Sequence, residues 1–243
     1  MIKLSNFSSF FVANWKLNGN FQFIDQFINN ISLPKDNSKC VVICPTSIHL
    51  DYMSKNKKGF YVGAQNVSEY DEGAFTGEIS AQSLSDLNVS FCIVGHSERR
   101  SLYKETDNAI NDKIKLLVEA NITPILCIGE TWEQRQDAIG EEIVSNQLSS
   151  CLDGLEACEI IIAYEPIWAI GSGNSCNTEQ IIEVSSEVKS LCGESTPFIY
   201  GGSVNEDNCK ELLSQNEIDG LLVGSASLSL DSFNKMISSI NSD

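Results

Sequence analysis

One carboxylate in this chain of 243 residues stands where it could act as a base. Glu165 directly follows the run Ile160 to Tyr164, which is too apolar for a half-exposed strand and is typical of a strand covered on both faces. Pro166 then restricts one backbone angle, whereas Gly171 and Gly173 allow several. The stretch fits a strand followed by an ordinary turn, but a rigid start and a flexible end also suit a segment that swings as a unit. The pattern therefore predicts a base beneath a lid.

Elements that could position this base alternate along the whole chain. Short apolar runs that predict buried strands are separated by segments of helical period. The runs lie at Phe10 to Ala13, Cys40 to Cys44, Phe60 to Ala64, Phe91 to Gly95, Ile122 to Ile128, Ile160 to Tyr164, Phe198 to Tyr200 and Ile218 to Val223. About eight strand–helix units in roughly 250 residues are typical of a closed parallel (β/α)8 barrel. No linker interrupts the series, so we expect a single domain over residues 1–243.

The helical segments show apolar residues at spacings that place them on one face. Thr178 and Asn205 are the residue types that cap helices at their amino ends, and we predict caps there. The predicted buried faces are Phe21, Ile24, Ile28 and Ile31; Ile110, Ile114, Leu117 and Val118; and Ile181, Val184, Val188 and Leu191.

Polar residues follow the predicted strands at the point where each strand ends. In a parallel barrel these ends share one face, which carries the active site. Separately, Lys16 fits a surface amine, His96 a buried imidazole and Ser203 a hydroxyl at a helix start. Together they predict a base, an imidazole, a cation and glycine-rich turns whose N–H groups can bind phosphate. The residues are Asn14 and Lys16 after the first run, His96 after the fourth, Glu165 after the sixth, Ser203 after the seventh and Gly224 after the eighth.

Composition excludes several classes of protein. The formal net charge of −17 disfavours nucleic acid as a partner, and it opposes the approach of an anionic substrate. No stretch has the length of a membrane span, and the N-terminus lacks the pattern of a secretory signal, so we expect a cytoplasmic protein. The nine cysteines include no Cys-x-x-Cys pair and are expected to be mostly buried packing residues. No cluster at metal-ligand spacing is evident, and we predict neither a metal nor a cofactor.

Five segments together resemble the triosephosphate isomerase family over essentially the full length of the chain. They are Ala13 to Asn18, Gly73 to Ser80, Val94 to Arg100, Ala163 to Gly173 and Tyr200 to Val204. The resemblance implies a TIM barrel that interconverts dihydroxyacetone phosphate and D-glyceraldehyde 3-phosphate, in glycolysis and gluconeogenesis, through an enediolate and without a cofactor.

The resemblance also implies a role for each matching residue. Glu165 is similar to the base of the family, and His96 to the imidazole that polarises the carbonyl. Lys16 and Asn14 are similar to the groups that stabilise the enediolate, and Glu98 and Ser97 to residues that support them. The implied phosphate contacts are Asn14, Lys16, Gly171, Ser203, Gly224 and Ser225. The implied lid consists of Pro166, Ile167, Trp168, Ala169, Ile170, Gly171, Ser172 and Gly173.

A homodimer is implied in the same way, because the loop Glu69 to Glu78 resembles one that places Thr76 near the partner's active site. Two segments depart from the family pattern. Ser225 stands where glycine is usual, and its side chain costs about 1 to 2 kcal/mol if the backbone there is left-handed. Tyr103 and Lys104 stand where Phe-Gly is usual.

Two alternatives to an isomerase remain open on the sequence. A barrel aldolase that forms a Schiff base needs a lysine at a central strand end, and the sixth run ends at Glu165 instead. A protein that binds sugar phosphates without catalysis has no need of the set Asn14, Lys16, His96 and Glu165.

Overall fold

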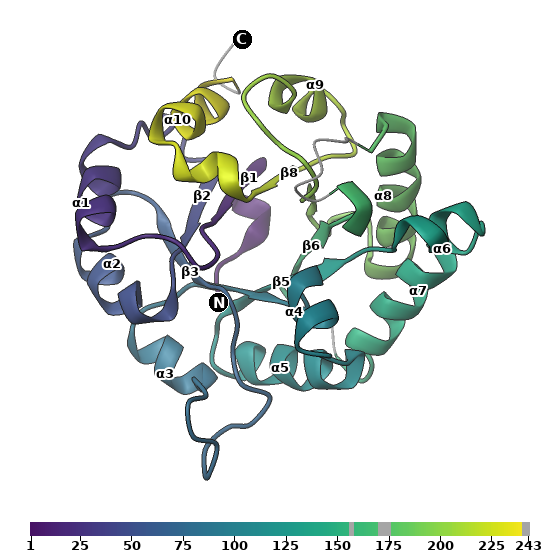
Figure 1. Ribbon diagram of the computed structural model, residues 1–243, viewed down its shortest axis with the longest axis horizontal. Coiled ribbons are helices and arrows are strands. Elements are labelled where there is room, and N and C mark those ends of the chain that lie inside the picture. Colours follow the sequence, from purple (N-terminus) through teal and green to yellow (C-terminus); the bar gives the residue numbers. More distant parts are fainter. Residues whose placement is uncertain (156–157, 170–175, 240–243) are drawn as a thin grey trace.

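A computed structural model describes residues 1–155, 158–169 and 176–239 of the chain. Its parallel strands follow one another around a closed barrel in sequence order, and β8 pairs with β1 (Figure 1). This confirms the predicted closed parallel barrel. The strands are β1 (Ser9–Asn14), β2 (Lys39–Cys44), β3 (Tyr61–Ala64), β4 (Phe91–Val94), β5 (Thr123–Ile128), β6 (Ile161–Tyr164), β7 (Phe198–Tyr200) and β8 (Gly220–Val223).

The strands are continuously apolar because each of them contributes to two apolar layers. In β1, Phe10 and Val12 belong to the cluster that fills the barrel, whereas Phe11 and Ala13 pack in the layer between the barrel and its helices. Successive side chains of a strand point to opposite faces. A strand with both faces covered therefore leaves no position for alternating polar residues.

The helices form the outer ring of the barrel (Figure 1). The α-helices are α1 (Phe21–Asn30), α2 (Leu50–Asn56), α3 (Ala81–Asp86), α4 (Ser97–Leu102), α5 (Asp107–Glu119), α6 (Trp132–Gln136), α7 (Gly140–Cys151), α8 (Thr178–Cys192), α9 (Cys209–Leu213) and α10 (Leu230–Ser238). Short 3-10 helices are η1 (Leu4–Asn6), η2 (Ser47–His49), η3 (Ile167–Ala169) and η4 (Ser225–Leu228).

The predicted apolar faces of α1, α5 and α8 are largely confirmed, with Ile24, Ile114 and Val184 fully packed against the barrel. Phe21 and Leu191 were assigned to the buried faces wrongly, since Phe21 is 52% exposed in the first turn of α1 and Leu191 is 50% exposed in the last turn of α8. The cysteine prediction is confirmed, because all of the cysteines are free and most are buried; only Cys158 and Cys192 are partly exposed.

Both predicted helix caps were wrong. Asn177 caps α8, where its side chain accepts from the N–H of Gln180 in a capping box, and Thr178 is the first helical residue. Asn205 stabilises a turn instead, because its side chain accepts from the N–H groups of Asp207 and Asn208 before α9 begins.

The loop between β3 and α3 projects beyond the barrel, at the bottom of Figure 1. Near its tip the rings of Tyr70 and Phe75 stack with their centroids 3.8 Å apart. Both side chains are exposed. In the part of the chain that the structure describes, no helix is both long enough and apolar enough to cross a membrane.

Candidate active site

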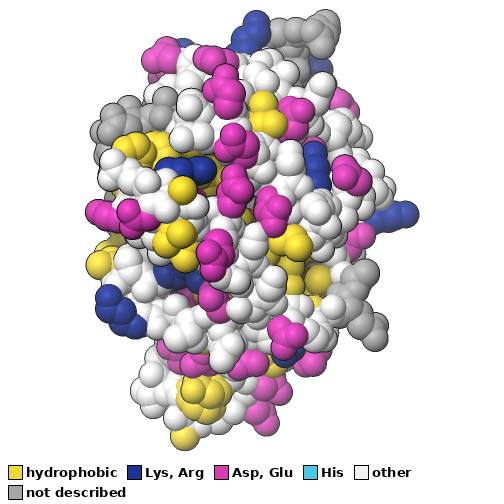
Figure 2. Space-filling view, turned by 90° about the vertical axis from the view of Figure 1, so that its right-hand side faces the viewer, with side chains coloured by type: hydrophobic (Ala, Val, Ile, Leu, Met, Phe, Trp, Pro, Cys, Tyr) yellow, Lys and Arg dark blue, Asp and Glu magenta, His cyan; other side chains and the backbone are white. Residues whose placement is uncertain are grey.

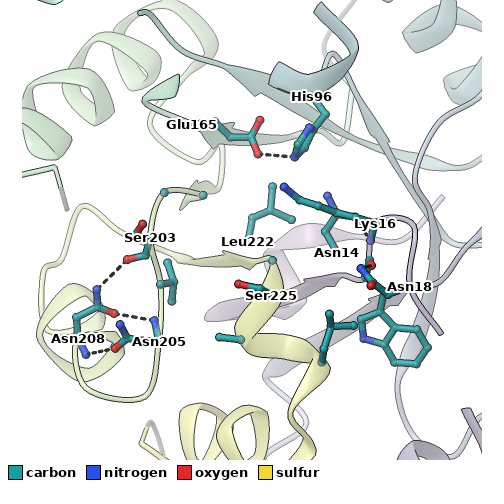
Figure 3. Close-up of a pocket in the computed structure, with 17 residues that line it drawn as sticks. Asn14, Lys16, Asn18, His96, Glu165, Ser203, Asn205, Asn208, Leu222 and Ser225 are labelled. Atoms are coloured by element: carbon teal, nitrogen blue, oxygen red, sulfur yellow. Dashed lines mark hydrogen bonds and ion pairs between the residues drawn. The ribbon is translucent and has the colours of Figure 1, made fainter. Parts of the chain in front are cut away.

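Glu165 lies directly after β6, and its carboxylate faces the imidazole that follows β4. Glu165 Oε1 is 3.0 Å from His96 Nε2 (Figure 3), and Oε2 accepts a hydrogen bond of 3.1 Å from the N–H of Ser97. Only 2% of Glu165 is exposed to solvent. Both oxygens of this carboxylate are thus engaged by protein donors.

Burial and hydrogen bonding act in opposite directions on Glu165. Burial raises the pKa of the carboxyl group, but the charge and hydrogen bond of His96 and the N–H of Ser97 outweigh it, so the pKa of Glu165 lies below its usual value. Burial lowers the pKa of His96, whereas the neighbouring Glu165 carboxylate raises it above its usual value. Each member of the pair therefore favours the charged form of the other.

A backbone contact on the other side of the imidazole opposes that charge. His96 is the N-cap residue of α4, and its Nδ1 accepts a hydrogen bond of 3.2 Å from the N–H of Glu98. Nδ1 can accept only while it carries no proton, so this contact favours a neutral ring with its proton on Nε2.

Asn14 and Lys16 lie below the Glu165 and His96 pair in Figure 3, and the side chain of Lys16 extends toward the middle of the site. Asn14 ends β1 and accepts a hydrogen bond from the N–H of Lys16 through Oδ1, at 3.1 Å. The backbone of Lys16 is left-handed, with a φ of 51°, and its Nζ is 2.6 Å from Glu98 Oε1. The predicted neighbourhood of Lys16 and Glu98 is thus present, and the lysine adopts a backbone conformation that is strained for a residue with a side chain.

Ser203, Gly224 and Ser225 lie on the β7 and β8 side of the same cavity. The hydroxyl of Ser203 donates to the carbonyl of Ala169 at 2.6 Å. Ser225 is not among the described non-glycine residues with positive φ, so the strain considered for its side chain is not present. Its hydroxyl faces the cavity in Figure 3.

Two glycines allow the chain to approach Glu165 closely. A Cβ at Gly129 would lie 1.9 Å from the carbonyl oxygen of Glu165, and one at Gly201 would lie 2.9 Å from Glu165 Cγ. Any larger residue would displace the base from its position. Because these glycines have no side chain, the ends of β5, β6 and β7 can pack closely around the carboxylate.

The cavity that these residues share has a volume of about 630 Å³. Asn14, Lys16, His96, Glu165, Ser203, Gly224 and Ser225 all line it. Ser97 and Glu98 do not line it, and Glu98 lines a second cavity beside it. Of the predicted lid, residues Pro166 to Ala169 are described, whereas Ile170, Gly171, Ser172 and Gly173 lie outside the described residues. Among the described residues, no group of His, Cys, Asp and Glu is arranged to hold a metal ion.

The sequence reasoning missed several polar residues near the site. Gln65 follows β3 and donates to the carbonyl of Lys16 at 2.9 Å, and Glu130 follows β5 and accepts from the hydroxyl of Tyr164 at 3.0 Å. Both could have been found with the strand-end rule used for the other residues. Asn208, which donates to the carbonyl of Ser203, comes from a turn that gave no such signal.

The fold and the cavity define a TIM-barrel protein with paired acid–base side chains at the carboxyl ends of its strands. A family model described as triosephosphate isomerase matches residues 9–240. The chain belongs to the triosephosphate isomerase family.

Proteins named triosephosphate isomerase from three bacteria are similar to this chain over nearly their whole length. The protein of Mesomycoplasma hyorhinis is 39% identical over 234 residues, which cover 93% of this chain and 96% of the relative. That of Francisella philomiragia is 37% identical, with 95% and 96% covered, and that of Colwellia psychrerythraea is 38% identical, with 91% and 93% covered. The predicted family and isomerase activity are confirmed, and the aldolase and binding-protein alternatives are set aside.

Proposed function

We propose that Glu165 is the base of the isomerisation of dihydroxyacetone phosphate and D-glyceraldehyde 3-phosphate. The reaction removes a C–H proton next to a carbonyl, gives an enediolate and returns the proton to the neighbouring carbon. The observation that carries this role is the buried Glu165 carboxylate 3.0 Å from His96 Nε2 in a cavity that Lys16 also lines. A carboxylate with a low pKa is in its basic form at neutral pH.

His96 acts on the oxygens of the substrate. When a carbonyl oxygen replaces Glu165 as the partner of Nε2, the influence that raises the pKa of His96 is weakened, and the N–H of Glu98 holds the ring neutral. A neutral ring donates its Nε2 proton to the developing oxyanion and can recover one from the other oxygen. Donors placed in this way lower such barriers by about 3 to 4 kcal/mol each.

Lys16 supplies the positive charge that balances the enediolate and the phosphate. Its Nζ pairs with Glu98, which restrains an otherwise flexible side chain at the mouth of the cavity. Asn14 fixes the strained turn through the N–H of Lys16. The backbone N–H groups after Gly202 and Gly224 are the proposed phosphate donors, with Ser203 and Ser225, together with Gly171 on the proposed lid.

Exchanging Glu165 for glutamine tests the assignment of the base. Glu165→Gln keeps the shape and a hydrogen-bonding group but removes the basic oxygen, so we expect turnover to fall by about 10² to 10⁴-fold with the fold retained. A coupled assay of isomerisation measures turnover, and circular dichroism checks folding. A folded variant with near-normal turnover would show that Glu165 is not the base.

We also propose that the chain forms a homodimer through the projecting loop Glu69 to Glu78. A second cavity of about 530 Å³, lined by Gln65, Glu98 and Tyr103 among others, adjoins the site and could receive Thr76 of another copy. Leu17 and Leu102, which also line it, are 93% and 73% exposed, which is unusual for large apolar side chains without a partner.

Sedimentation velocity tests the dimer. The chain should sediment with twice the mass of one copy, and replacing residues 70–77 by a short glycine–serine link should give monomers with much lower activity. A parent chain that is monomeric at micromolar concentration, yet fully active, contradicts the proposal.

A further inference from the structure

The indole of Trp168 makes two contacts with the segment that follows β5. Its Nε1 donates to Glu130 Oε1 at 3.3 Å, and its ring meets the ring of Trp132 edge to face, with centroids 5.0 Å apart and planes inclined at 60°. One contact is polar and the other aromatic. We call this arrangement of Glu130 and Trp132 around Trp168 the indole seat.

The polar half of the indole seat belongs to a buried hydrogen-bond network. Glu130 is fully buried, and its Oε1 also accepts from the hydroxyl of Tyr164 and from Arg135 Nε, each at 3.0 Å. Arg135 Nη2 in turn donates to the Tyr164 hydroxyl. Because this oxygen has other donors, the bond to Trp168 can be released without leaving Oε1 unpaired, although Oε2 is buried without a hydrogen-bond partner among the described residues.

The aromatic half combines contact with Trp168 and exposure to solvent. Trp132 is the first residue of α6, held in place by a capping box between Thr131 and Gln134, and it remains 46% exposed. A large side chain that is half in solvent contributes little to the core. Its edge-to-face contact with Trp168 is worth about 0.5 to 1.5 kcal/mol beyond burial.

Trp168 belongs to η3, which is tied to two residues of the active site. Glu165 lies two residues before η3, and the N–H of Ile167 donates to the carbonyl of Glu130. At its other end, the carbonyl of Ala169 accepts the Ser203 hydroxyl. The position of η3 is therefore linked both to the base and to a serine that lines the cavity.

In this arrangement the groups proposed to contact substrate are engaged with the protein. Both Glu165 oxygens have protein donors, and the Ser203 hydroxyl is donated to Ala169. A ligand that uses the Ser203 hydroxyl must break the bond to η3. By linkage, an interaction that stabilises η3 in this position weakens the binding of such a ligand by the same free energy.

We infer that Trp132 is a positioning residue that holds η3, through Trp168, in the arrangement in which Glu165 and Ser203 are engaged with protein partners. This inference rests on the proposed function of Glu165 and Ser203. Trp132 touches no reacting atom. Its contact with Trp168 determines how readily η3 moves away from the indole seat when a phosphorylated ligand binds.

Exchanging Trp132 for leucine removes the aromatic contact and keeps an apolar side chain. If Trp132 favours the engaged arrangement, Trp132→Leu should bind 2-phosphoglycolate, which carries a phosphate and a planar carboxylate like the enediolate, about two- to twelve-fold more tightly. KM should fall by a similar factor while kcat changes less. Trp132→Phe keeps a ring edge and should remain close to the parent chain. Titration calorimetry and the coupled assay give these values.

A spectroscopic readout separates positioning from simple packing. The near-ultraviolet circular dichroism of the Trp132 and Trp168 pair should diminish when 2-phosphoglycolate is added to the parent chain, because the rings then separate. A signal that the ligand leaves unchanged would overturn the inference. So would a Trp132→Leu variant that melts at a lower temperature but binds like the parent, or one that binds more weakly.

Leu191→Ala is a matched control, since it truncates an exposed apolar side chain in the last turn of α8. That turn lies at the amino ends of the strands, because a helix after a barrel strand runs back along it. The affinity of Leu191→Ala for 2-phosphoglycolate should equal that of the parent chain. If the parent chain has no isomerase activity and does not bind 2-phosphoglycolate, the proposed function is wrong. If the parent chain is active and binds 2-phosphoglycolate, and Trp132→Leu has the same affinity and KM, only the inference about Trp132 is wrong.

Discussion

At the residue scale, the ionisation of Glu165 depends on two neighbours. Burial alone would raise the pKa of this carboxyl group. The group would then become protonated, and lose its basic form, at a higher pH. His96 and the N–H of Ser97 reverse that effect by donating to its two oxygens. The base is consequently kept charged in a place from which water is largely excluded.

Replacing His96 should therefore change the titration of Glu165. In His96→Gln the electrostatic and hydrogen-bonding effect of the imidazole is lost, and burial is opposed only by Ser97 and Lys16, so the pKa of Glu165 should rise. Since a group with a lowered pKa loses its proton at lower pH, the wild-type carboxylate should stay ionised below pH 4.5, the ordinary value, and protonate only as the pH falls further. Carbon NMR of labelled glutamate side chains measures both pKa values.

The second histidine provides the control for this titration. His49 hydrogen-bonds to Thr46 through Nδ1 at 2.7 Å, and among the described residues no hydrogen bond or ion pair joins it to Glu165. His49→Gln should leave the pKa of Glu165 where it is in the wild type. An unchanged pKa in His96→Gln would mean that the pair does not govern the charge of the base.

At the element scale, the connection from α4 to α5 contains a left-handed residue that is not glycine. Lys104 has a φ of 58°, at the position where the family usually has glycine. Its Nζ donates to the carbonyl of Ser101 at 2.7 Å, which offsets part of the strain. The turn is enforced by Glu105, which follows it and pairs with Arg99 of α4 and Lys113 of α5.

Lys104→Gly should stabilise the protein. Relief of the left-handed strain outweighs the extra chain entropy and the lost hydrogen bond by about 1 kcal/mol, which raises the melting temperature by roughly 2 to 4 °C in a chain of this size. Asn88→Gly is the matched control. Asn88 has a similar φ of 56°, but asparagine tolerates this conformation, so little gain is expected there. Thermal unfolding of both variants checks the difference, and equal gains would contradict the explanation.

At the scale of the whole molecule, negative charge dominates the surface. Asp and Glu side chains are spread over the face shown in Figure 2, with fewer Lys and Arg among them. The net charge of −17 opposes an anionic triose phosphate at long range, whereas Lys16 attracts it at short range. The two effects differ in how strongly salt screens them.

Moderate salt should therefore help association. Raising the ionic strength from about 0.01 to 0.15 M shortens the screening length from about 30 to 8 Å, which suppresses the distant acidic charges more than the contact with Lys16. We expect kcat/KM for D-glyceraldehyde 3-phosphate to rise or hold steady, and that for unphosphorylated D-glyceraldehyde to respond less. A steep fall for the phosphorylated substrate would show that a local positive patch outweighs the net charge.

The sequence by itself determined the barrel and the residues that converge in it. Continuous apolar runs such as Cys40 to Cys44 indicate strands buried on both faces, and residues after such strands must meet at one end of a closed parallel barrel. Asn14, His96 and Glu165 could be predicted together for this reason. The caps at Thr178 and Asn205 could not, because local side-chain geometry shifts a helix start by a few residues.

Only the tertiary structure decided how these groups act on one another. The partners of Glu165, the neutral tautomer favoured at His96 and the grip of Trp132 on Trp168 depend on contacts between residues from different strand ends. Hydrogen bonds and ring contacts depend on distances of a few tenths of an ångström, which residue types and spacing do not determine. The sequence predicts which groups meet, and the packed barrel decides which of them donates, which accepts and which is held back.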